Sequence, residues 1–409
     1  MKSLPTRVSA FLLTVVFIFG ATGIAAAVAA PERRIDFEPD QLVIRIRGDA
    51  EPFRVLKYPV AIDVAGEAKL LQSRFDLEYA EPNFIARALF VPNDAQYKLQ
   101  WNFDNPLSGG IDTEEAWDLA QGEGVTVAVV DTGVAYENYE ESRRGPKYVL
   151  APDLAGTLFV PGYDFVNNDA HPNDDNGHGT HVAGTIAGST NNKVGVAGIA
   201  FAARLMPVKV LDRTGVGTYA NIARGIRFAV DSGATIINLS LGGAADSITL
   251  RGAVSYARDR GATLIAAAGN DAENFVSYPA AYDDAVIAVG ATRIDQARAA
   301  YSNYGASLDV VAPGGDLRVD QNNDGYSDGI LQQTFQRNPA RFGYYFFQGT
   351  SMAAAHVSGV AALVSAYKAT TSPLYIREAL ERTAEDLGAP GVDPEYGNGL
   401  INALRALQY

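Results

Sequence analysis

Short apolar runs alternate with helix-like segments along most of the chain after residue 90. Near-continuous apolar runs of this kind are typical of strands that are buried on both faces of a parallel sheet. We expect strands at Val125–Val130, Arg204–Leu211, Thr235–Leu241, Thr263–Ala268, Ala285–Gly290 and Leu308–Ala312. We expect helices at His178–Gly188, Tyr219–Asp231, Ile248–Arg260, Ser351–Tyr367 and Leu374–Thr383. The pattern predicts an α/β fold, a mostly parallel sheet covered by helices on both faces.

Residues 31–89 follow a different pattern, which indicates a separate small unit. Gln41–Arg47 ends in alternating apolar and basic residues, as a half-buried strand does. Glu67–Phe75 is helix-like, and Asn83–Phe90 is a second strand-like run. We therefore expect a small α+β domain ahead of a main domain at 90–409. A unit of about sixty residues is marginal by itself, so we expect a partner surface to stabilise it.

The first thirty residues carry the pattern of a secretory signal peptide. Lys2 and Arg7 precede the apolar run Phe11–Phe19, and the small residues Ala25–Ala30 follow. The alternative is a membrane anchor, but the apolar run is short for a membrane span, which favours cleavage near Ala29 or Ala30. No later segment is long and apolar enough to cross a bilayer. We expect an exported protein, extracellular or periplasmic, without a stable membrane anchor.

Charge and composition narrow the function. The formal net charge of -14 argues against a nucleic-acid partner or an anionic lipid surface. The chain has no Cys, which excludes disulfides, thiolate catalysis, Cys-ligated zinc and a lipid-modified N-terminal Cys.

Asp131 and His178 are candidates for acid–base chemistry. Asp131 follows a predicted buried strand, and ligands gather at the carboxyl ends of parallel strands, although an Asp there can also cap a helix or close a turn. His178 lies between two glycines at the start of a predicted helix, and a general base near neutral pH is most often His. His178 and His181 could instead bind zinc. Their spacing is i, i+3, and the pair lacks the Glu of a metalloprotease motif.

Ser351 and Asn270 complete a set that suits acyl transfer. Ser351 precedes a strong helical pattern, so its plain interpretation is an N-cap, yet the free N–H groups of a helix start also suit an oxyanion. Asn270 offers a side-chain amide for the same purpose. A hydroxyl, an imidazole and a carboxylate are the three groups that nucleophilic acyl transfer needs. The motif around Ser351 lacks the second Gly of Gly-x-Ser-x-Gly, which disfavours an α/β-hydrolase.

A polar run in the last third of the chain follows the calcium-loop rule. Oxygen side chains stand at positions 1, 3, 5 and 9, Gly325 is at position 6, and Leu331 replaces the usual Glu at position 12. A polar turn is the alternative interpretation. The candidate ligands are Asp320, Asn322, Asp324 and Asp328.

The residues from Val91 to Gln408 resemble the subtilisin-like serine proteases (subtilases), and among them the thermitase-like enzymes. The resemblance rests on Val130–Gly133, Asn176–Gly184, Ala266–Asn270 and Gly349–Ala353, in that order; the order Asp, His, Ser is that of the subtilisin triad. It implies Asp131 as the orienting carboxylate, His178 as general base and then acid, and Ser351 as nucleophile. Asn270 and the backbone N–H of Ser351 would hold the oxyanion, and His181 would be structural.

The resemblance also implies how a peptide binds. The substrate would add as a strand between Gly215-Val216-Gly217 and Ser240-Leu241-Gly242. The pocket before the scissile bond would be neutral and roomy, suited to a large apolar or aromatic side chain, with Asp271 and Glu273 near enough to admit a basic one. Its lining would be Leu241, Gly242, Ala268, Gly269 and Ser277.

By the same resemblance, residues 31–89 are a propeptide that assists folding and then inhibits. Glu78–Asn83 is typical of its end region, and Pro92-Asn93-Asp94 aligns with the start of the mature enzymes, which implies self-cleavage near Leu89–Phe90. The sequence departs from the family where Ala354-Ala355, rather than a Pro, precedes His356, and where Glu137–Leu150 forms a longer loop.

Two further calcium sites follow from the resemblance. The first would use the side chains of Asp94, Asp153 and Asn192 with the carbonyls of Thr190, Val194 and Val196. The second would use Asp164, Asp169 and Asn173, and is weakened because Asn167 stands where thermitase-like enzymes have Asp.

We therefore expect a secreted, calcium-stabilised serine endopeptidase that processes itself from a proenzyme, acts as a monomer on proteins or peptides, and has its own propeptide as a partner. Two alternatives stay open. One is a catalytically silent, calcium-dependent binding module; the other is a serine esterase.

Overall fold

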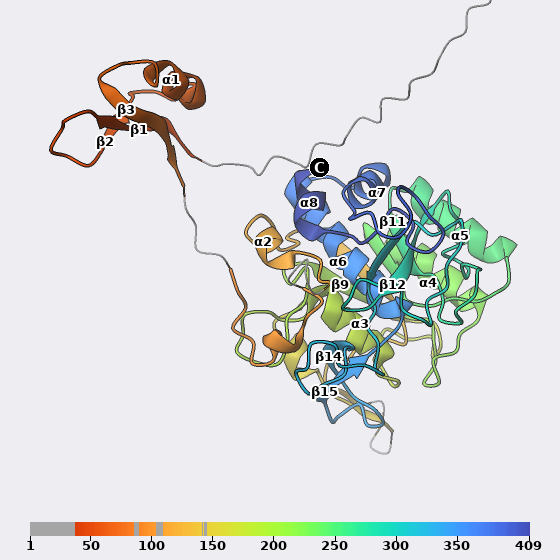
Figure 1. Cartoon of the computed structure of the whole chain (residues 1–409). Helices are drawn as coiled ribbons and strands as arrows, with labels where there is room; N and C mark the ends of the chain where they lie inside the picture. The colour runs from red at the N-terminus through yellow and green to blue at the C-terminus, as the bar shows by residue number, and fades with distance from the viewer. Residues whose placement is uncertain (1–36, 86–89, 104–108, 141, 143–144) are drawn as a thin grey trace, which may run out of the picture. The chain divides into compact units, whose positions relative to one another are not determined.

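The computed structural model describes residues 37–85, 90–103, 109–140, 142 and 145–409. The chain divides into two units, Met1–Ile85 and Ala86–Tyr409 (Figure 1). The signal peptide expected at residues 1–30 lies outside the described residues, and so does Leu89 of the expected cleavage site.

The N-terminal unit is a three-stranded antiparallel sheet with one helix. Its elements are β1 (Phe37–Ile46), β2 (Arg54–Lys57), α1 (Val64–Leu71) and β3 (Leu77–Phe84), and the strand order is β2-β1-β3. The strand predicted at Asn83–Phe90 begins too late: β3 ends at Phe84, Ile85 and Phe90 are outside any strand, and residues 86–89 of the prediction lie outside the described residues. Pro82 lies inside β3 and disguises it in the sequence, but β3 is an edge strand, where a missing N–H is tolerated.

The predicted helix of this unit is displaced, and one strand was missed. The helix begins at Val64 because the carboxylate of Asp63 accepts a hydrogen bond from the Gly66 N–H at 3.0 Å, a cap that the pattern of apolar positions does not show. The short strand β2 carries no long apolar run. Two small clusters, Leu42 with Val64 and Ala68, and Ile44 with Leu77 and Ala80, make up the buried interior.

The larger unit is built on a parallel sheet, which confirms the predicted fold class. Its strand order is β13-β12-β11-β10-β4-β9-β7, and the short β8 also pairs with β9. All six predicted strands are present, with ends that differ from the prediction by no more than two residues. The strands are β4 (Thr126–Asp131), β7 (Leu158–Phe159), β8 (Tyr163–Asp164), β9 (Arg204–Lys209), β10 (Ile236–Leu239), β11 (Thr263–Ala267), β12 (Val286–Thr292) and β13 (Val310–Pro313).

Helices cover both faces of this sheet. In the register of β10 and β4, Asn238 pairs with Val129, and Asn238 is hydrogen-bonded to Ser358 of α6. Successive strand residues point to opposite faces, and the next residue, Val130, lies against Gly225 of α4. The described helices are α2 (Thr113–Trp117), α3 (His178–Ala187), α4 (Tyr219–Asp231), α5 (Ile248–Asp259), α6 (Thr350–Lys368), α7 (Pro373–Arg382) and α8 (Ala403–Gln408).

The remaining elements lie around this core. They are the 3-10 turns Tyr97–Leu99 and Pro152–Leu154, the pair β5 (Tyr139–Glu140) and β6 (Lys147–Tyr148), and the hairpin β14 (Ile330–Thr334) and β15 (Gly343–Phe347). α3 packs against α6 and β14, so the hairpin lies beside the helix that begins with His178 (Figure 1).

The parallel sheet brings the candidate residues to one edge. Asp131 ends β4, Ser240 follows β10, and Asn270 follows β11 by three residues. The carboxyl ends of parallel strands lie at the same edge of a sheet, so these three residues, which are far apart in the sequence, all lie at that edge.

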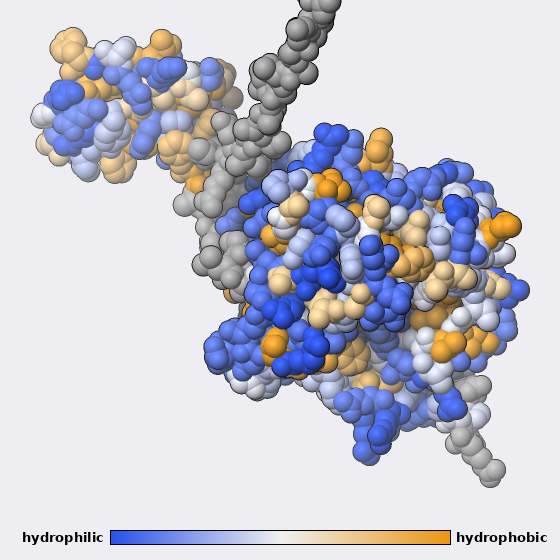
Figure 2. Space-filling view, turned by 45° about the vertical axis from the view of Figure 1, so that its right-hand side comes forward, coloured by the Kyte–Doolittle hydropathy of each residue, from blue (hydrophilic) through white to orange (hydrophobic). Residues whose placement is uncertain are grey.

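Hydrophobic side chains on the surface are dispersed. Figure 2 shows them on the visible face as small groups among hydrophilic residues. Ile248 and Leu374 are among the exposed ones. Exposed apolar residues of this kind are ordinary on a folded surface. Within the described residues, no helix is both long and apolar enough to span a bilayer.

Candidate active site

Asp131 and His178 meet in the structure although they are 47 residues apart. Asp131 is fully buried at the end of β4, and the Nδ1–H of His178 donates to its Oδ1 at 2.7 Å. The bond fixes the imidazole with Nε2 free to accept a proton. Burial lowers the pKa of His178, but the charge and hydrogen bond of Asp131 more than offset this, so the pKa stands above its usual value.

Two glycines allow His178 to approach the sheet. Gly177, the N-cap of α3, has φ 105°, and a Cβ there would lie 2.4 Å from the carbonyl oxygen of Phe335. A Cβ on Gly179 would lie 2.1 Å from the carbonyl oxygen of Gly133, which is part of the loop that follows β4. Only glycine lets the start of α3 lie this close to Asp131.

A second buried carboxylate, that of Asp174, joins the loop after β4 to the start of α3, and the sequence analysis missed it. The Asp174 carboxylate accepts hydrogen bonds from the Thr132 hydroxyl at 2.9 Å and from the Gly177 N–H at 2.9 Å. It also accepts from the N–H and the hydroxyl of Thr180. Burial raises its pKa. An Asp shortly before a helix start is a capping signal, and this could have pointed to Asp174.

Ser351 lies in the first turn of α6, but it is not the N-cap; Gly349 holds that position. Its hydroxyl donates to the Ser240 carbonyl at 3.2 Å, and the Ser240 hydroxyl donates to the Ser351 carbonyl at 2.9 Å. Behind Ser240, the buried amide of Asn238 donates to the Ser240 hydroxyl at 2.9 Å and accepts from Ser358. The sequence offered no signal for this buried support.

The amide of Asn270 is oriented by its neighbour Thr350. Its Oδ1 accepts hydrogen bonds from the N–H of Thr350 at 2.9 Å and from the Thr350 hydroxyl at 3.0 Å. With the oxygen held, the NH₂ group is the part left to donate to a ligand. Asn270 and Ser351 line the same pocket.

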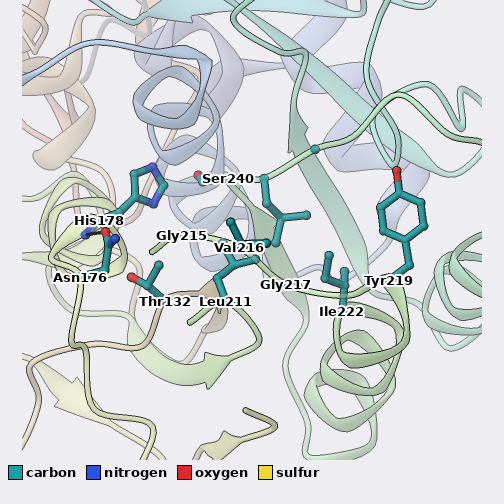
Figure 3. Close-up of a pocket in the computed structure, with 12 residues that line it drawn as sticks. Thr132, Asn176, His178, Leu211, Gly215, Val216, Gly217, Tyr219, Ile222 and Ser240 are labelled. Carbon is teal, nitrogen blue, oxygen red and sulfur yellow. Dashed lines mark hydrogen bonds between the residues drawn. The ribbon is translucent and has the colours of Figure 1, made fainter. Parts of the chain in front are cut away.

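Two adjoining pockets flank these residues and share Ser240, Leu241 and Gly242 as a common wall. The first encloses about 370 Å³; His178 lies at one end and Tyr219 at the other, with Gly215, Val216 and Gly217 alongside (Figure 3). The second encloses about 320 Å³ and holds Ser351 and Asn270.

The pockets contain nearly all the predicted substrate residues. Gly269 and Ser277 line the second pocket together with the acidic Asp271 and Glu273. Ala268 is fully buried and is not part of the lining; its neighbour Ala267 takes that place. Sequence reasoning also missed further lining residues: Thr132, Asn176, Leu211, Tyr219, Ile222, Gly243, Ala244, Phe275 and Thr350.

His181 is fully buried, and its ring is held by backbone carbonyls. Its Nε2–H donates to the Ile330 carbonyl at 3.0 Å, and its ring stacks on Phe347 with centroids 4.3 Å apart. Burial, with the nearby charge of His178, lowers its pKa to about 3. Among the residues that the structure describes, no three His, Asp or Glu side chains are grouped closely enough to hold a metal ion. The bond of His181 to a backbone carbonyl and its stacking on Phe347 suit the structural role that the resemblance implies for it.

The side chains of the first predicted calcium set lie close to one another. Asp94 and Asp153 are both buried, the side-chain NH₂ of Asn192 donates to Asp153 at 3.2 Å, and the Asn192 oxygen accepts the Val194 N–H at 2.6 Å. The backbone N–H of Val196 donates to Asp153, and that of Asn191 donates to Asp94. Burial, followed by the charge of Asp94, raises the pKa of Asp153 to about 6. In the described part of the chain, neither carboxylate forms an ion pair with Lys or Arg.

The other two calcium sets are less suited to a cation. The Asp164 carboxylate already accepts from two backbone N–H groups and from the amide of Asn167, the residue at which the resemblance implies an Asp. Asp169 accepts from the His171 N–H, and the oxygen of Asn173 is buried without a partner among the described residues. In the loop at 320–328, the oxygens of Asp320, Asn322, Asp324 and Asp328 accept the loop's own N–H groups.

Comparison with known proteins agrees with this geometry. Residues 122–399 match the family model described as the subtilase family. The chain is 40% identical to the thermophilic serine proteinase of Bacillus sp. (strain AK1) over 87% of its length and 78% of the relative's. It is 40% identical to thermitase of Thermoactinomyces vulgaris over 73% of its length and 94% of thermitase's. A solved protease of Pseudoalteromonas arctica PAMC 21717 is 35% identical, with a TM-score of 0.66, over 78% of this chain and 99% of that one.

A buried carboxylate bonded to an imidazole, with a serine hydroxyl in the adjoining pocket, is the arrangement expected of a serine hydrolase. The chain belongs to the subtilase family of serine endopeptidases.

Proposed function

We propose that the protein is a secreted endopeptidase that cuts peptide bonds through Asp131, His178 and Ser351 and an acyl-enzyme intermediate. The observation that carries the proposal is the 2.7 Å bond between His178 and Asp131 beside two pockets that share one wall. A catalytically silent binding module would not require a buried carboxylate hydrogen-bonded to an imidazole. Two pockets in a row suit an extended peptide better than the short acyl chain of a simple ester.

In the proposed reaction, the Ser351 oxygen attacks the scissile carbonyl carbon while His178 Nε2 takes the hydroxyl proton. The carbonyl oxygen becomes an oxyanion, and Asp131 stabilises the imidazolium that forms. When the tetrahedral intermediate collapses, the carbon–nitrogen bond breaks and His178 gives its proton to the leaving amine. Water then attacks the ester with His178 again as base, which releases the acid and restores Ser351.

The test is hydrolysis of casein and of a short peptide by the full chain. Hydrolysis of both is expected, and loss of the activity with S351A assigns it to this site. A chain that cleaves only simple esters would favour the esterase alternative, and one that cleaves neither would favour the silent module.

Replacing Asn270 is expected to slow the acylation step. N270A removes the only side-chain donor that we propose for the oxyanion, so kcat should fall about 100- to 1,000-fold, the range measured for such a donor in a subtilisin. KM should change little, because the donor acts mainly in the transition state. N338A, at an exposed asparagine that lines neither pocket, serves as the control. A large rise in KM at unchanged kcat would contradict the oxyanion role.

We further propose that residues 1–30 are a signal peptide and residues 31–89 a propeptide that inhibits until it is cleaved near Leu89–Phe90. Residues 37–85, the described part of the N-terminal unit, have two small buried clusters, as expected of a domain that depends on a partner surface. The similarity to a thermostable alkaline protease of Halalkalibacterium halodurans spans 97% of this chain and 98% of that one, at 35% identity, so the N-terminal region has a counterpart there.

Calcium is proposed at the first set only, where the residues fit it. Two buried carboxylates lie close enough that the charge of Asp94 raises the pKa of Asp153, and a cation between them would relieve that repulsion. Asp94, Asp153 and Asn192 would hold the ion with the carbonyls of Thr190, Val194 and Val196. Its contribution would be stability rather than chemistry.

Removing calcium is expected to lower the unfolding temperature. At calcium 100 times above its Kd, binding adds about 2.7 kcal/mol to the free energy of unfolding, and a chelator would remove it. Calorimetry with and without EGTA measures the shift, and it should shrink in D94N but persist in D320N. A shift that disappears in D320N instead would place the ion in the loop at 320–328, and no shift in the parent chain would contradict calcium binding.

A further inference from the structure

Lys209 is a buried charge that the proposed reaction does not use. It ends β9 and pairs with Asp131 in the register of β9 and β4. Its side chain is 1% exposed. An ammonium taken out of water costs several kcal/mol unless it is paired and fully hydrogen-bonded, so its position calls for an explanation.

The ammonium of Lys209 uses all three of its donors. It donates to the Thr132 carbonyl at 2.6 Å, to the Asp175 carboxylate at 2.6 Å and to the Leu211 carbonyl at 2.9 Å. Three donors with three acceptors leave the charge fully satisfied.

Each acceptor belongs to a different segment of the candidate site. Thr132 directly follows Asp131, and its hydroxyl also binds the Asp174 carboxylate. Asp175 lies three residues before His178, in the loop that leads into α3. Leu211 lines the first pocket and begins the loop that carries Gly215, Val216 and Gly217 to the same pocket.

One charged group therefore joins the segment of the orienting carboxylate, the loop before the base and the edge on which substrate would bind. A buried ion pair is weak evidence for stability, because apolar residues of similar volume often stabilise a fold as well or better. What an apolar residue cannot do is fix three backbone segments relative to one another by directed hydrogen bonds.

We propose that Lys209 is a positioning residue, which sets the base against the substrate-binding edge through Thr132, Asp175 and Leu211. The proposal rests on the proposed proteolytic function. Lys209 would then affect two properties of the enzyme. It would affect the rate of the chemical step, through the Asp131–His178 pair, and the binding of longer substrates, through their contacts with Gly215–Gly217.

The test compares K209M, D175N and the control K98M, an exposed lysine outside the site. Each full-length protein is titrated with a covalent serine reagent, so that rates refer to active enzyme. kcat and KM are then measured for a short peptide that occupies only the pocket of Ser351 and for a longer one that also reaches Gly215–Gly217. Activity of the parent chain on both peptides establishes the proposed function before any variant is interpreted.

In K209M, kcat is expected to fall about 10- to 100-fold for both peptides, since a displacement near 1 Å can have that effect. KM is expected to rise for the longer peptide only. The ratio of kcat/KM for the longer peptide to kcat/KM for the short peptide should therefore fall. D175N replaces the charged acceptor with a neutral amide oxygen, which weakens one of the three contacts, and should lower kcat by a few-fold while keeping the higher kcat/KM for the longer peptide. K209Q keeps two N–H donors and should lie between the parent and K209M.

A purely structural lysine would give a different result. K209M would then unfold at a lower temperature, yet each active site would keep the parent's kcat and the parent's preference for the longer peptide, and the proposal would be overturned. If neither Lys209 variant folds, D175N decides: parental kcat per active site would overturn the proposal, and a few-fold loss would support it.

Discussion

Replacing Ser351 with Ala is expected to abolish peptide hydrolysis, with a fall in kcat of about a million-fold, the size measured for the nucleophile of a subtilisin. The substitution removes the one oxygen that can form the acyl ester. The fold should survive, because the Ser351 hydroxyl makes a single hydrogen bond, to the Ser240 carbonyl at 3.2 Å, and Gly349 rather than Ser351 caps α6. Hydrolysis of casein and of a short peptide measures the loss, and calorimetry checks that the variant is folded.

The same variant tests self-processing. The parent chain should mature with an N-terminus near Phe90, whereas S351A should keep residues 31–89, because cleavage by its own site is blocked. N-terminal sequencing distinguishes the two, and S232A, at an exposed serine after α4, is the matched control. A mature start more than about five residues from Phe90 would contradict the proposed bond, and full activity of S351A would end the assignment of the nucleophile.

Replacing Asp131 with Asn is expected to lower kcat about 10,000-fold with little change in KM. An amide of the same shape keeps the packing at the end of β4, where Asp131 is fully buried. It cannot stabilise the imidazolium, and its NH₂ group can turn His178 into the wrong tautomer. Since Oδ1 of Asp131 also accepts the Thr132 N–H at 2.7 Å, the amide oxygen has a competing partner.

The pH profile separates this electrostatic role from a structural one. His178 must be neutral to act as a base, so kcat/KM of the parent should fall as the pH drops through its raised pKa. In D131N, the carboxylate that raises the pKa is gone while the burial that lowers it remains. The acid limb of kcat/KM should therefore move to lower pH. A limb that stays in place, or moves to higher pH, would show that Asp131 does not control the charge of His178.

The carboxylates near His178 show where sequence reasoning stops. The sequence predicts Asp131 as the partner of His178, from the strand that it follows and from the resemblance, and does not single out Asp174, four residues before His178. The structure assigns Asp131 to the imidazole and gives Asp174 the N–H groups at the start of α3. The direction of a strand end and the turn before a helix decide this, and neither appears in the order of residues.

The calcium predictions show a related limit. The loop at 320–328 has the spacing of a calcium loop, but spacing does not reveal that its oxygens accept the loop's own N–H groups. The set of Asp94 and Asp153 was expected only from the resemblance. The structure adds that two distant segments both bury a carboxylate here and that the charge of Asp94 raises the pKa of Asp153, which is the observation behind our calcium proposal.

The sequence by itself determined the alternation of strands and helices, the position of Asp131 at a strand end, and the positions of His178 and Ser351 at helix starts. These features are local, because apolar periodicity and the positions of glycines indicate which secondary structure each short segment favours. The tertiary structure decided which side chains meet: the hydrogen bond of His178 with Asp131, the wall that two pockets share, and the three contacts of Lys209. Such contacts depend on strand register and on the direction of each side chain, which only the packed sheet fixes.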